Sequence, residues 1–198
     1  MHGLESFDDD GHGTVFRDVI MLALLGFVTV VVLLLPHLNP PTLADAEVTA
    51  PGNVIVEVRW ADGLDADVDL WVEAPGDRPV GYSNRGGRIF NLLRDDLGDK
   101  GDETDLNYEV AFTRGTPSGD YTINLHLYRN PSGEFPIEAE VKVSVRRTAD
   151  SGVLKVASNR AVLATAGQEL TVLRFALDEE GQLVPGSVHD LPRPLRSG

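Results

Sequence analysis

The sequence contains no cysteine among its 198 residues. This absence excludes disulfides, cysteine-ligated zinc, iron–sulfur clusters and thiol nucleophiles. Basic residues are scarce as well, because 17 Lys and Arg oppose 31 Asp and Glu and leave a formal net charge of −14. Nucleic-acid binding requires a basic surface that neutralises phosphates, so we expect no nucleic-acid partner.

Motifs of catalytic sites are also lacking. The five histidines form no H-E-x-x-H zinc motif. No serine lies in a nucleophile elbow, and no glycine-rich phosphate loop joins a strand to a helix. We therefore predict that the protein is not an enzyme and holds no cofactor. His126 lies within an expected strand, where we interpret it as a satisfied sheet residue, and we interpret Trp60 and Trp71 as packing residues.

Long apolar runs occur at a single place in the sequence. Apart from Arg17 and Asp18, residues 14–35 carry no charge. As a helix they would extend about 33 Å, enough to cross a hydrocarbon core of about 30 Å. The proline that follows is expected to end the helix, so we predict one transmembrane helix over 14–36. The alternative is a signal peptide cleaved near Ala46, although the run exceeds the usual apolar region of about 7–15 residues.

The rest of the chain divides by composition. Residues 1–13 are polar and acidic, and we expect them to form a disordered cytoplasmic tail. Residues 37–52 form a predicted linker rich in proline and small residues, 53–190 the folded domain, and 191–198 a loose C-terminal tail. Arg17 is the only basic residue near either end of the helix. The positive-inside rule then predicts a cytoplasmic N-terminus and a periplasmic domain.

The folded domain shows the period-two alternation of β-strands. Turn signals such as Pro75-Gly76 and Ser118-Gly119 separate the alternating segments. Such short strands with regular turns predict an antiparallel β-sandwich, so the expected fold class is one transmembrane helix plus an all-β domain. The expected strands are 54–60, 67–72, 107–113, 120–129, 136–146, 153–157, 160–165 and 168–177.

A carboxylate near the start of the apolar helix is the most informative residue of that segment. Residues 15–27, VFRDVIMLALLGF, carry Asp18 and continue with apolar residues. The segment resembles the transmembrane helix of the ExbD/TolR family, which is related to MotB. The resemblance implies a B-type subunit of a proton- or sodium-driven rotary motor, in which Asp18 carries the ion. Thr29, three turns deeper, would either bond back to its own helix, as is usual, or offer a second polar stop.

The same resemblance implies an arrangement in the membrane. Two copies of this chain would pass, as a dimer, through a ring of multi-span MotA/TolQ/ExbB-like subunits in the bacterial inner membrane. The β-sandwich would engage an envelope target. The sequence departs from the family at Phe16 and Arg17, where a proline and an uncharged residue are usual. An ion pair between Arg17 and Asp18 would hold the carboxylate ionised. Alternatively, Asp18 only marks the helix start, where the helix dipole favours it.

A second resemblance covers residues 54–146. A D-x-D-L-x-V strand at 67–72, the turn that follows it and the later Gly119-Asp120-Tyr121 resemble a periplasmic or secreted β-sandwich module of unknown function. The resemblance implies binding or scaffolding. The alternative function is thus a membrane-anchored extracytoplasmic module that binds a protein, a glycan or calcium. Tyr121 is expected to lock the fold, with its ring in the core and its hydroxyl on the backbone.

The acidic residues of this module suggest calcium as one ligand. Asp65, Asp67 and Asp69 alternate on one strand face, and residues 95–105 form an acidic loop. Calcium takes about 6–8 oxygen ligands, although the EF-hand template fails here. The other interpretation is a solvated loop in which arginines pair with the aspartates. The calcium candidates are Asp67, Asp69, Asp96, Asp99 and Asp102, and the arginine candidates are Arg85, Arg88 and Arg94.

Overall fold

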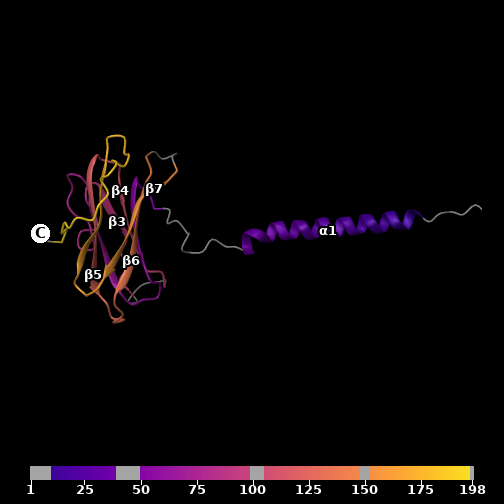
Figure 1. The fold of residues 1–198 in the computed structure, drawn as a ribbon, viewed down its shortest axis with the longest axis horizontal. Helices are drawn as coiled ribbons and strands as arrows, with labels where there is room; N and C mark the ends of the chain where they lie inside the picture. The colour runs from indigo at the N-terminus through magenta and orange to yellow at the C-terminus, as the bar shows by residue number, and fades with distance from the viewer. Residues whose placement is uncertain (1–9, 39–49, 99–104, 148–151, 197–198) are drawn as a thin grey trace, which may run out of the picture. The chain divides into compact units, whose positions relative to one another are not determined.

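The computed structural model describes residues 10–38, 50–98, 105–147 and 152–196 (Figure 1). The chain divides into two units, Met1–Val48 and Thr49–Gly198. The described part of the first unit is a helix, and that of the second is built from antiparallel sheets. The expected fold class, an N-terminal helix plus an all-β sandwich domain, is confirmed.

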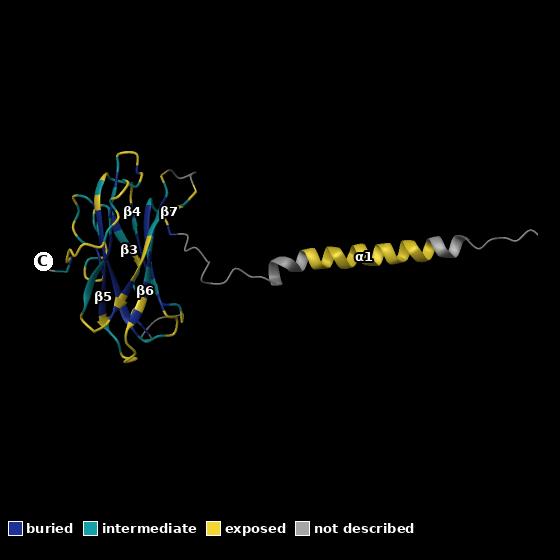
Figure 2. Cartoon of the chain, viewed as in Figure 1, coloured by how far each residue is buried: buried dark blue, intermediate teal, exposed yellow. Residues whose placement is uncertain are grey.

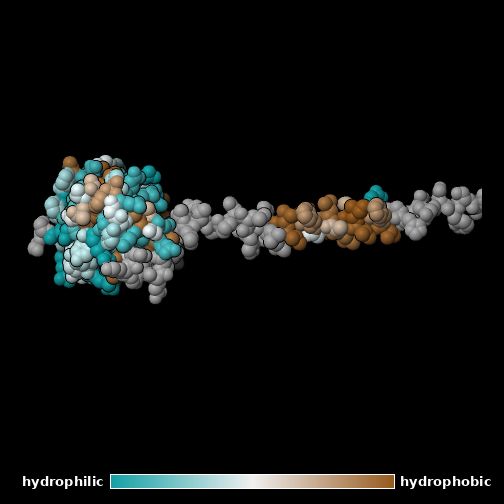
Figure 3. All heavy atoms as spheres, turned by 90° about the horizontal axis from the view of Figure 1, so that it is seen from below, coloured by the Kyte–Doolittle hydropathy of each residue, from teal (hydrophilic) through white to brown (hydrophobic). Residues whose placement is uncertain are grey.

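The first unit contains α1 (Asp10–Leu38), a helix of 29 residues. Within it, Val15–Val32 is long and apolar enough to cross a membrane, a property that a signal sequence near an N-terminus shares. Every side chain of this stretch is exposed (Figure 2), and apolar residues cover most of its surface (Figure 3). A helix that is apolar all round needs an apolar environment, which the described chain does not supply.

The ends of α1 differ from those we predicted. The helix starts at Asp10, so residues 10–13, which we expected in a disordered tail, are helical. An acidic residue in the first turn is favoured by the helix dipole, which accounts for the earlier start. The helix ends at Leu38, two residues beyond Pro36, within the one or two residues by which helix ends are defined.

The second unit is a β-sandwich of two antiparallel sheets. One has the strand order β3-β4-β1-β6-β7 and the other β2-β5-β8. Apolar side chains alternate along the strands and form one buried core between the sheets. Figure 2 colours the buried residues of these strands dark blue. The strands are β1 (Val54–Trp60), β2 (Asp67–Glu73), β3 (Phe90–Arg94), β4 (Tyr108–Thr113), β5 (Gly119–Arg129), β6 (Ile137–Val145), β7 (Leu154–Leu163) and β8 (Glu169–Leu177).

Tyr121, near the start of β5, is a fixed point of this core. Its side chain is wholly buried, and its ring stacks on Phe175 with the ring centroids 4.9 Å apart. Its hydroxyl donates a hydrogen bond to the Pro117 carbonyl oxygen at 2.7 Å. Burial raises the pKa of this hydroxyl, so it stays a donor. The prediction that Tyr121 locks core to backbone is confirmed.

Two strands differ from the sequence prediction. β3 was not predicted, and it pairs with β4 along the edge of the larger sheet. β7 is one continuous strand where we expected two, 153–157 and 160–165. It pairs with β6 along its whole length, with a register shift at Val143/Ser144 that absorbs an extra residue. The pairing with β6 therefore keeps β7 extended through the polar residues that suggested a break between two strands.

The C-terminal segment is also different from our prediction. We expected 191–198 to be a loose tail, but the described residues 191–196 are bound to the smaller sheet. The Arg193 N–H donates to Thr171 Oγ1 at 2.8 Å, and the Leu195 N–H donates to Glu169 Oε1 at 2.8 Å. Leu195 is only 7% exposed. The contacts are with strands far away in sequence, which local composition does not reveal.

Candidate functional site

Asp18 lies in the apolar stretch of α1, and its side chain is exposed. Within the part of the chain that the structure describes, it makes no side-chain hydrogen bond or ion pair. The ion pair with Arg17 that we considered is therefore not present. Neighbouring residues of a helix do not face each other, which accounts for the separation.

Thr29 lies 11 residues beyond Asp18, about three turns and close to the same face of α1. Its Oγ1 donates to the Leu25 carbonyl oxygen at 2.8 Å. Hydroxyls in helices commonly make this bond to the preceding turn. The hydroxyl proton is thus used within the helix, while the oxygen keeps acceptor capacity.

The two aspartates of β2 are buried, and each has a partner from β5. Asp69 Oδ2 lies 2.7 Å from His126 Nδ1, and Asp67 Oδ2 accepts a hydrogen bond from Arg129 Nε at 3.2 Å. These partners differ from the arginines that the sequence suggested, because β5 lies beside β2 in the sheet. Those arginines pair with other acids: Arg85 with Asp95, Arg88 with Asp77, and Arg94 with Asp96.

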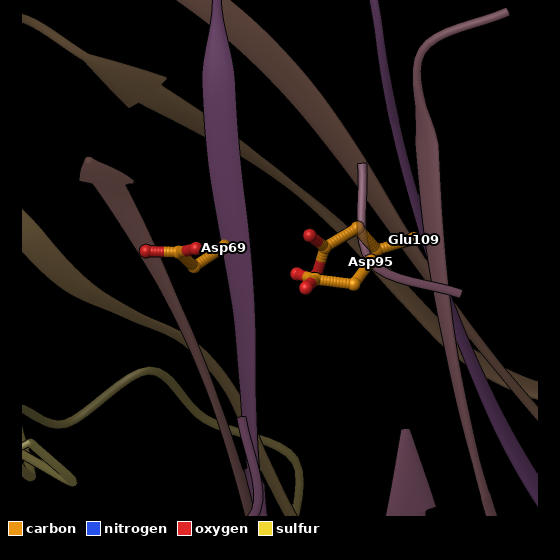
Figure 4. Close-up of side chains that lie close together, drawn as sticks. All are labelled: Asp69, Asp95 and Glu109. Atoms are coloured by element: carbon orange, nitrogen blue, oxygen red, sulfur yellow. The ribbon is translucent and has the colours of Figure 1, made fainter. Parts of the chain in front are cut away.

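Three carboxylates meet where the two sheets approach each other. Asp69, Asp95 and Glu109 each offer an oxygen atom, and these atoms lie within 4.8 Å of one another. Figure 4 shows the side chains of Asp95 and Glu109 next to each other, directed toward the strand that carries Asp69. We refer to these three residues as the carboxylate cluster. It joins β2, β4 and the segment after β3.

Glu109 is the most enclosed member of the carboxylate cluster, with no exposed surface. Its Oε2 accepts the Leu70 N–H at 2.7 Å, and its Oε1 accepts the Asp96 N–H at 3.1 Å. One side chain therefore holds the edge of β2 and the segment after β3 together. Buried backbone N–H groups need such acceptors.

Burial dominates the electrostatics of these acids. It raises the pKa of Glu109 well above its ordinary value, against the lowering effect of the Leu70 amide. Burial also raises the pKa of Asp69, against the hydrogen bond from His126. Burial and the nearby charge of Asp69 raise the pKa of Asp67 to about 6. The region therefore holds protons at a pH where ordinary carboxylates are ionised.

The calcium candidates are only partly brought together. Asp69 belongs to the carboxylate cluster, whereas Asp96 uses its oxygens on the Gly98 and Tyr108 amides, at 3.0 and 3.2 Å. Asp99 and Asp102 lie outside the described residues. Asp95 Oδ1 is buried and has no hydrogen-bond partner among the described residues, so a proton or a cation would satisfy it. Both oxygens of Glu109 are already in use, which leaves fewer open ligands than calcium requires.

Sequence reasoning did not single out Glu109. It alternates with Ala111 and Thr113 on the core-facing side of β4, and all three are buried. The sequence did contain a signal for a buried glutamate. Glu109 shares one strand face with two small residues, which leave room in the core for its longer side chain. His126 was interpreted as a satisfied sheet residue, and its bond to Asp69 confirms that interpretation.

No family model, curated protein or solved structure matches this chain. Its function is therefore argued from its own residues and their geometry.

Proposed function

We propose that this chain is a B-type subunit of a proton- or sodium-driven motor of the ExbD/TolR/MotB kind in the bacterial inner membrane. The observation that carries the proposal is Asp18, a carboxylate within Val15–Val32 that has no bonding partner in the described chain. An acid at membrane depth is costly, and such residues commonly belong to ion pathways. In this proposal Asp18 carries the ion, and the groups that surround Asp18 come from other chains.

A single helix cannot enclose an ion path, so the proposal requires a partner. All side chains from Val15 to Val32 are exposed, which leaves the whole circumference of α1 for contact with other helices or lipid. A multi-span MotA/TolQ/ExbB-like subunit supplies the enclosure. Two copies of this chain lie within its ring, so that Asp18 of each copy meets ring helices.

The neighbours of Asp18 on α1 support the same function. Arg17 does not pair with Asp18, so the carboxylate is available to an ion. Thr29 lies about 16 Å deeper on nearly the same face and offers an acceptor oxygen along the path. Arg17 also favours a cytoplasmic N-terminus, which directs the β-sandwich to the periplasm, where it engages an envelope target.

A second candidate function is that of a membrane-anchored module whose sandwich binds a protein, a glycan or calcium. One atom of the carboxylate cluster favours it, Asp95 Oδ1, which is buried without a hydrogen-bond partner among the described residues, whereas both oxygens of Glu109 are in use. In this alternative the helix is only an anchor, and Asp18 has no role beyond the helix start.

The experiment that tests the motor proposal compares the full chain with its Asp18→Asn variant, each purified from native membranes in detergent. We expect a multi-span partner to co-purify with both, because the substitution preserves shape. Ion flux through the reconstituted complex is expected to be lost only in the Asn variant. Val28→Leu, which leaves every polar side chain of α1 in place, is the matched control, and we expect it to retain most of the flux.

Two results would contradict the motor proposal. One is the absence of any multi-span partner in the wild-type preparation. The other is full ion flux in the Asp18→Asn complex. If either is found, a calcium titration of the thermal unfolding midpoint addresses the second candidate, with Asp95→Asn as the variant that should lose any response.

A further inference from the structure

The outer face of the sheet β2-β5-β8 is mostly polar, yet it is covered and not exposed to water. In a sandwich, the face away from the core normally meets water and is polar. Here nine outward residues form three cross-strand rows, and none of the nine is exposed. The rows are Asp69–His126–Glu169, Trp71–Asn124–Thr171 and Glu73–Thr122–Arg174.

The C-terminal segment 191–196 contributes to this cover, and Arg193 contacts all three strands. Its N–H donates to Thr171 Oγ1 on β8 at 2.8 Å, and its carbonyl oxygen accepts from Asn124 Nδ2 on β5 at 2.8 Å. Its guanidinium lies 2.6 Å from Glu73 Oε2 on β2. Two residues later, the Leu195 N–H donates to Glu169.

The segment has the chemistry of a bound peptide. Pro192 and Pro194 have no N–H and favour an extended backbone, so alternate residues, Arg193 and Leu195, present the donors. Residues 191–194 are exposed, while Leu195 is buried against the sheet. The positive segment lies on a face that carries three carboxylates.

The cover leaves polar atoms of this face without partners. Four buried atoms have no hydrogen-bond partner among the described residues: Trp71 Nε1, Thr122 Oγ1, Asn124 Oδ1 and Arg174 Nε. Buried polar groups are normally hydrogen-bonded, because each unmet group costs free energy. A face that served only to pack the C-terminus would have no use for these groups. A ligand that bonds to these groups would gain free energy that the present cover does not.

We propose that the outer face of β2-β5-β8 is a peptide-binding groove that residues 191–196 occupy in the resting chain. The ligand that replaces them is an extended, basic, proline-containing segment of a partner protein. A second copy of this chain is the weaker choice, because its identical segment gains nothing over the tethered one, whose effective concentration is about millimolar. A different sequence can gain bonds to unmet atoms of this face, such as Asn124 Oδ1 on the side chain that already contacts Arg193.

The test uses the chain ended at Asp190 and a fluorescent peptide of sequence LPRPLRSG, residues 191–198, followed by fluorescence anisotropy. The shortened chain is expected to bind this peptide, and the intact chain at least ten-fold more weakly because its groove is filled. A peptide with Arg193→Glu is expected to lose binding, and to regain it on a shortened chain with Glu73→Arg. A folded shortened chain that does not bind, or that binds both peptides equally, would overturn the proposal.

Loss of folding in the shortened chain would also overturn it, because the segment would then be part of the fold. Amide exchange of the intact chain gives an independent measurement. The Arg193 and Leu195 amides should exchange at least 100-fold faster than those of Ile123 and Leu125, which lie in β5. Equal rates would mean that the segment leaves the sheet only on global unfolding, and the groove would be rejected.

The identity of the occupant is tested with a peptide array that varies each position of LPRPLRSG. We expect sequences that bind the shortened chain at least ten-fold more tightly than the chain's own, through unmet atoms such as Asn124 Oδ1. If none does, no partner peptide is better matched than the resting segment, and the proposal fails. A dimer of the intact chain that dissociates when LPRPLRSG is added would assign the groove to a second copy instead.

Discussion

Glu109 in the sandwich and Asp18 in the helix are both carboxylates in apolar surroundings, but the chain treats them differently. Glu109 is wholly buried and accepts hydrogen bonds from two backbone amides. Asp18 is exposed on an apolar helix and has no partner among the described residues. The partners of Glu109 are lost only if the domain unfolds, whereas the described chain supplies no partner to Asp18. Glu109 is therefore a structural acid of the sandwich, and the motor function proposed for Asp18 requires partners that other chains supply.

The largest expected effect is that of removing the enclosed acid. Glu109→Ala leaves two buried amides without acceptors and opens a cavity, so we expect a loss of about 3–5 kcal/mol in the free energy of unfolding. Urea unfolding of the full chain, followed by tryptophan fluorescence, measures it. Glu140→Ala is the control, because its exposed pair with Lys142 contributes less than about 1 kcal/mol. Equal losses would remove the distinction between the two kinds of acid.

The next effect is on the pH dependence of stability. Burial, followed by the charge of Asp69, raises the pKa of Asp67 to about 6, so the folded chain holds a proton that the unfolded chain releases near pH 4. Stability is therefore highest below pH 4 for this group and falls as the pH rises to 6, by about 1–3 kcal/mol. In Asp67→Asn the fall should be shallower.

Asp77 provides the contrast for that measurement. Burial acts to raise its pKa, but hydrogen bonds from backbone amides, Ile89 first, outweigh it and hold the pKa below its ordinary value. Its contribution is present above the unfolded pKa of about 4 and is lost as the pH falls below it. Asp77→Asn should therefore be less stable than the wild type above pH 4 and should lack the part of the wild type's fall in stability that Asp77 causes below pH 4. A pH profile that is unchanged in Asp67→Asn would contradict the assignment.

A smaller effect is expected at the lock between core and backbone. Tyr121→Phe keeps the ring stacked on Phe175 but removes the hydrogen bond to Pro117, which contributes about 1 kcal/mol. Calorimetry should show a midpoint lowered by about 2–4 °C. Tyr128→Phe, at an exposed tyrosine of the same strand, should leave the midpoint unchanged. If Tyr128→Phe lowered the unfolding midpoint more than Tyr121→Phe, the hydrogen bond from Tyr121 to Pro117 would not be what locks the core to the backbone.

The smallest effect on folding is expected at Asp18, which has the largest expected effect on ion flux. Asp18→Asn removes no contact within the described chain, so the unfolding free energy of the sandwich should change by less than about 0.5 kcal/mol. Helix content by circular dichroism should also be unchanged in detergent. A clear loss of either would show that Asp18 has a structural partner, and the contrast with Glu109 would disappear.

Local patterns predicted most of the sandwich. Strands such as β1 and β6 alternate so regularly that side-chain period alone located them. β3 was missed because it is short and follows a glycine-rich turn, and its pairing with β4 is what makes it a strand. The split of β7 was wrong for the same reason, since β6 continues past the polar residues.

The polar sites were harder to predict, because they depend on register. Asp67 and Asp69 were singled out from their spacing, but their partners, Arg129 and His126, lie about 60 positions later in the chain. Composition likewise described 191–196 as a loose tail. Its attachment rests on Thr171, Asn124 and Glu73, which the sheet brings together from three strands. Spacing reveals a site only when its members are close in sequence.

The hydrogen bond that Glu109 accepts at the edge of β2 also affects how readily the sandwich aggregates. Its bond to Leu70 and the pairing of Val72 with Val80 use the amides that a foreign strand would need. Segments beside β8 and β3 protect those edges in the same way, through His189 and Gly86. The remaining edge strand, β7, carries the exposed charges Lys155 and Arg160, which disfavour strand addition. The edges of the described sheets therefore offer few free amides to a foreign strand, which lowers the tendency to aggregate through edge pairing.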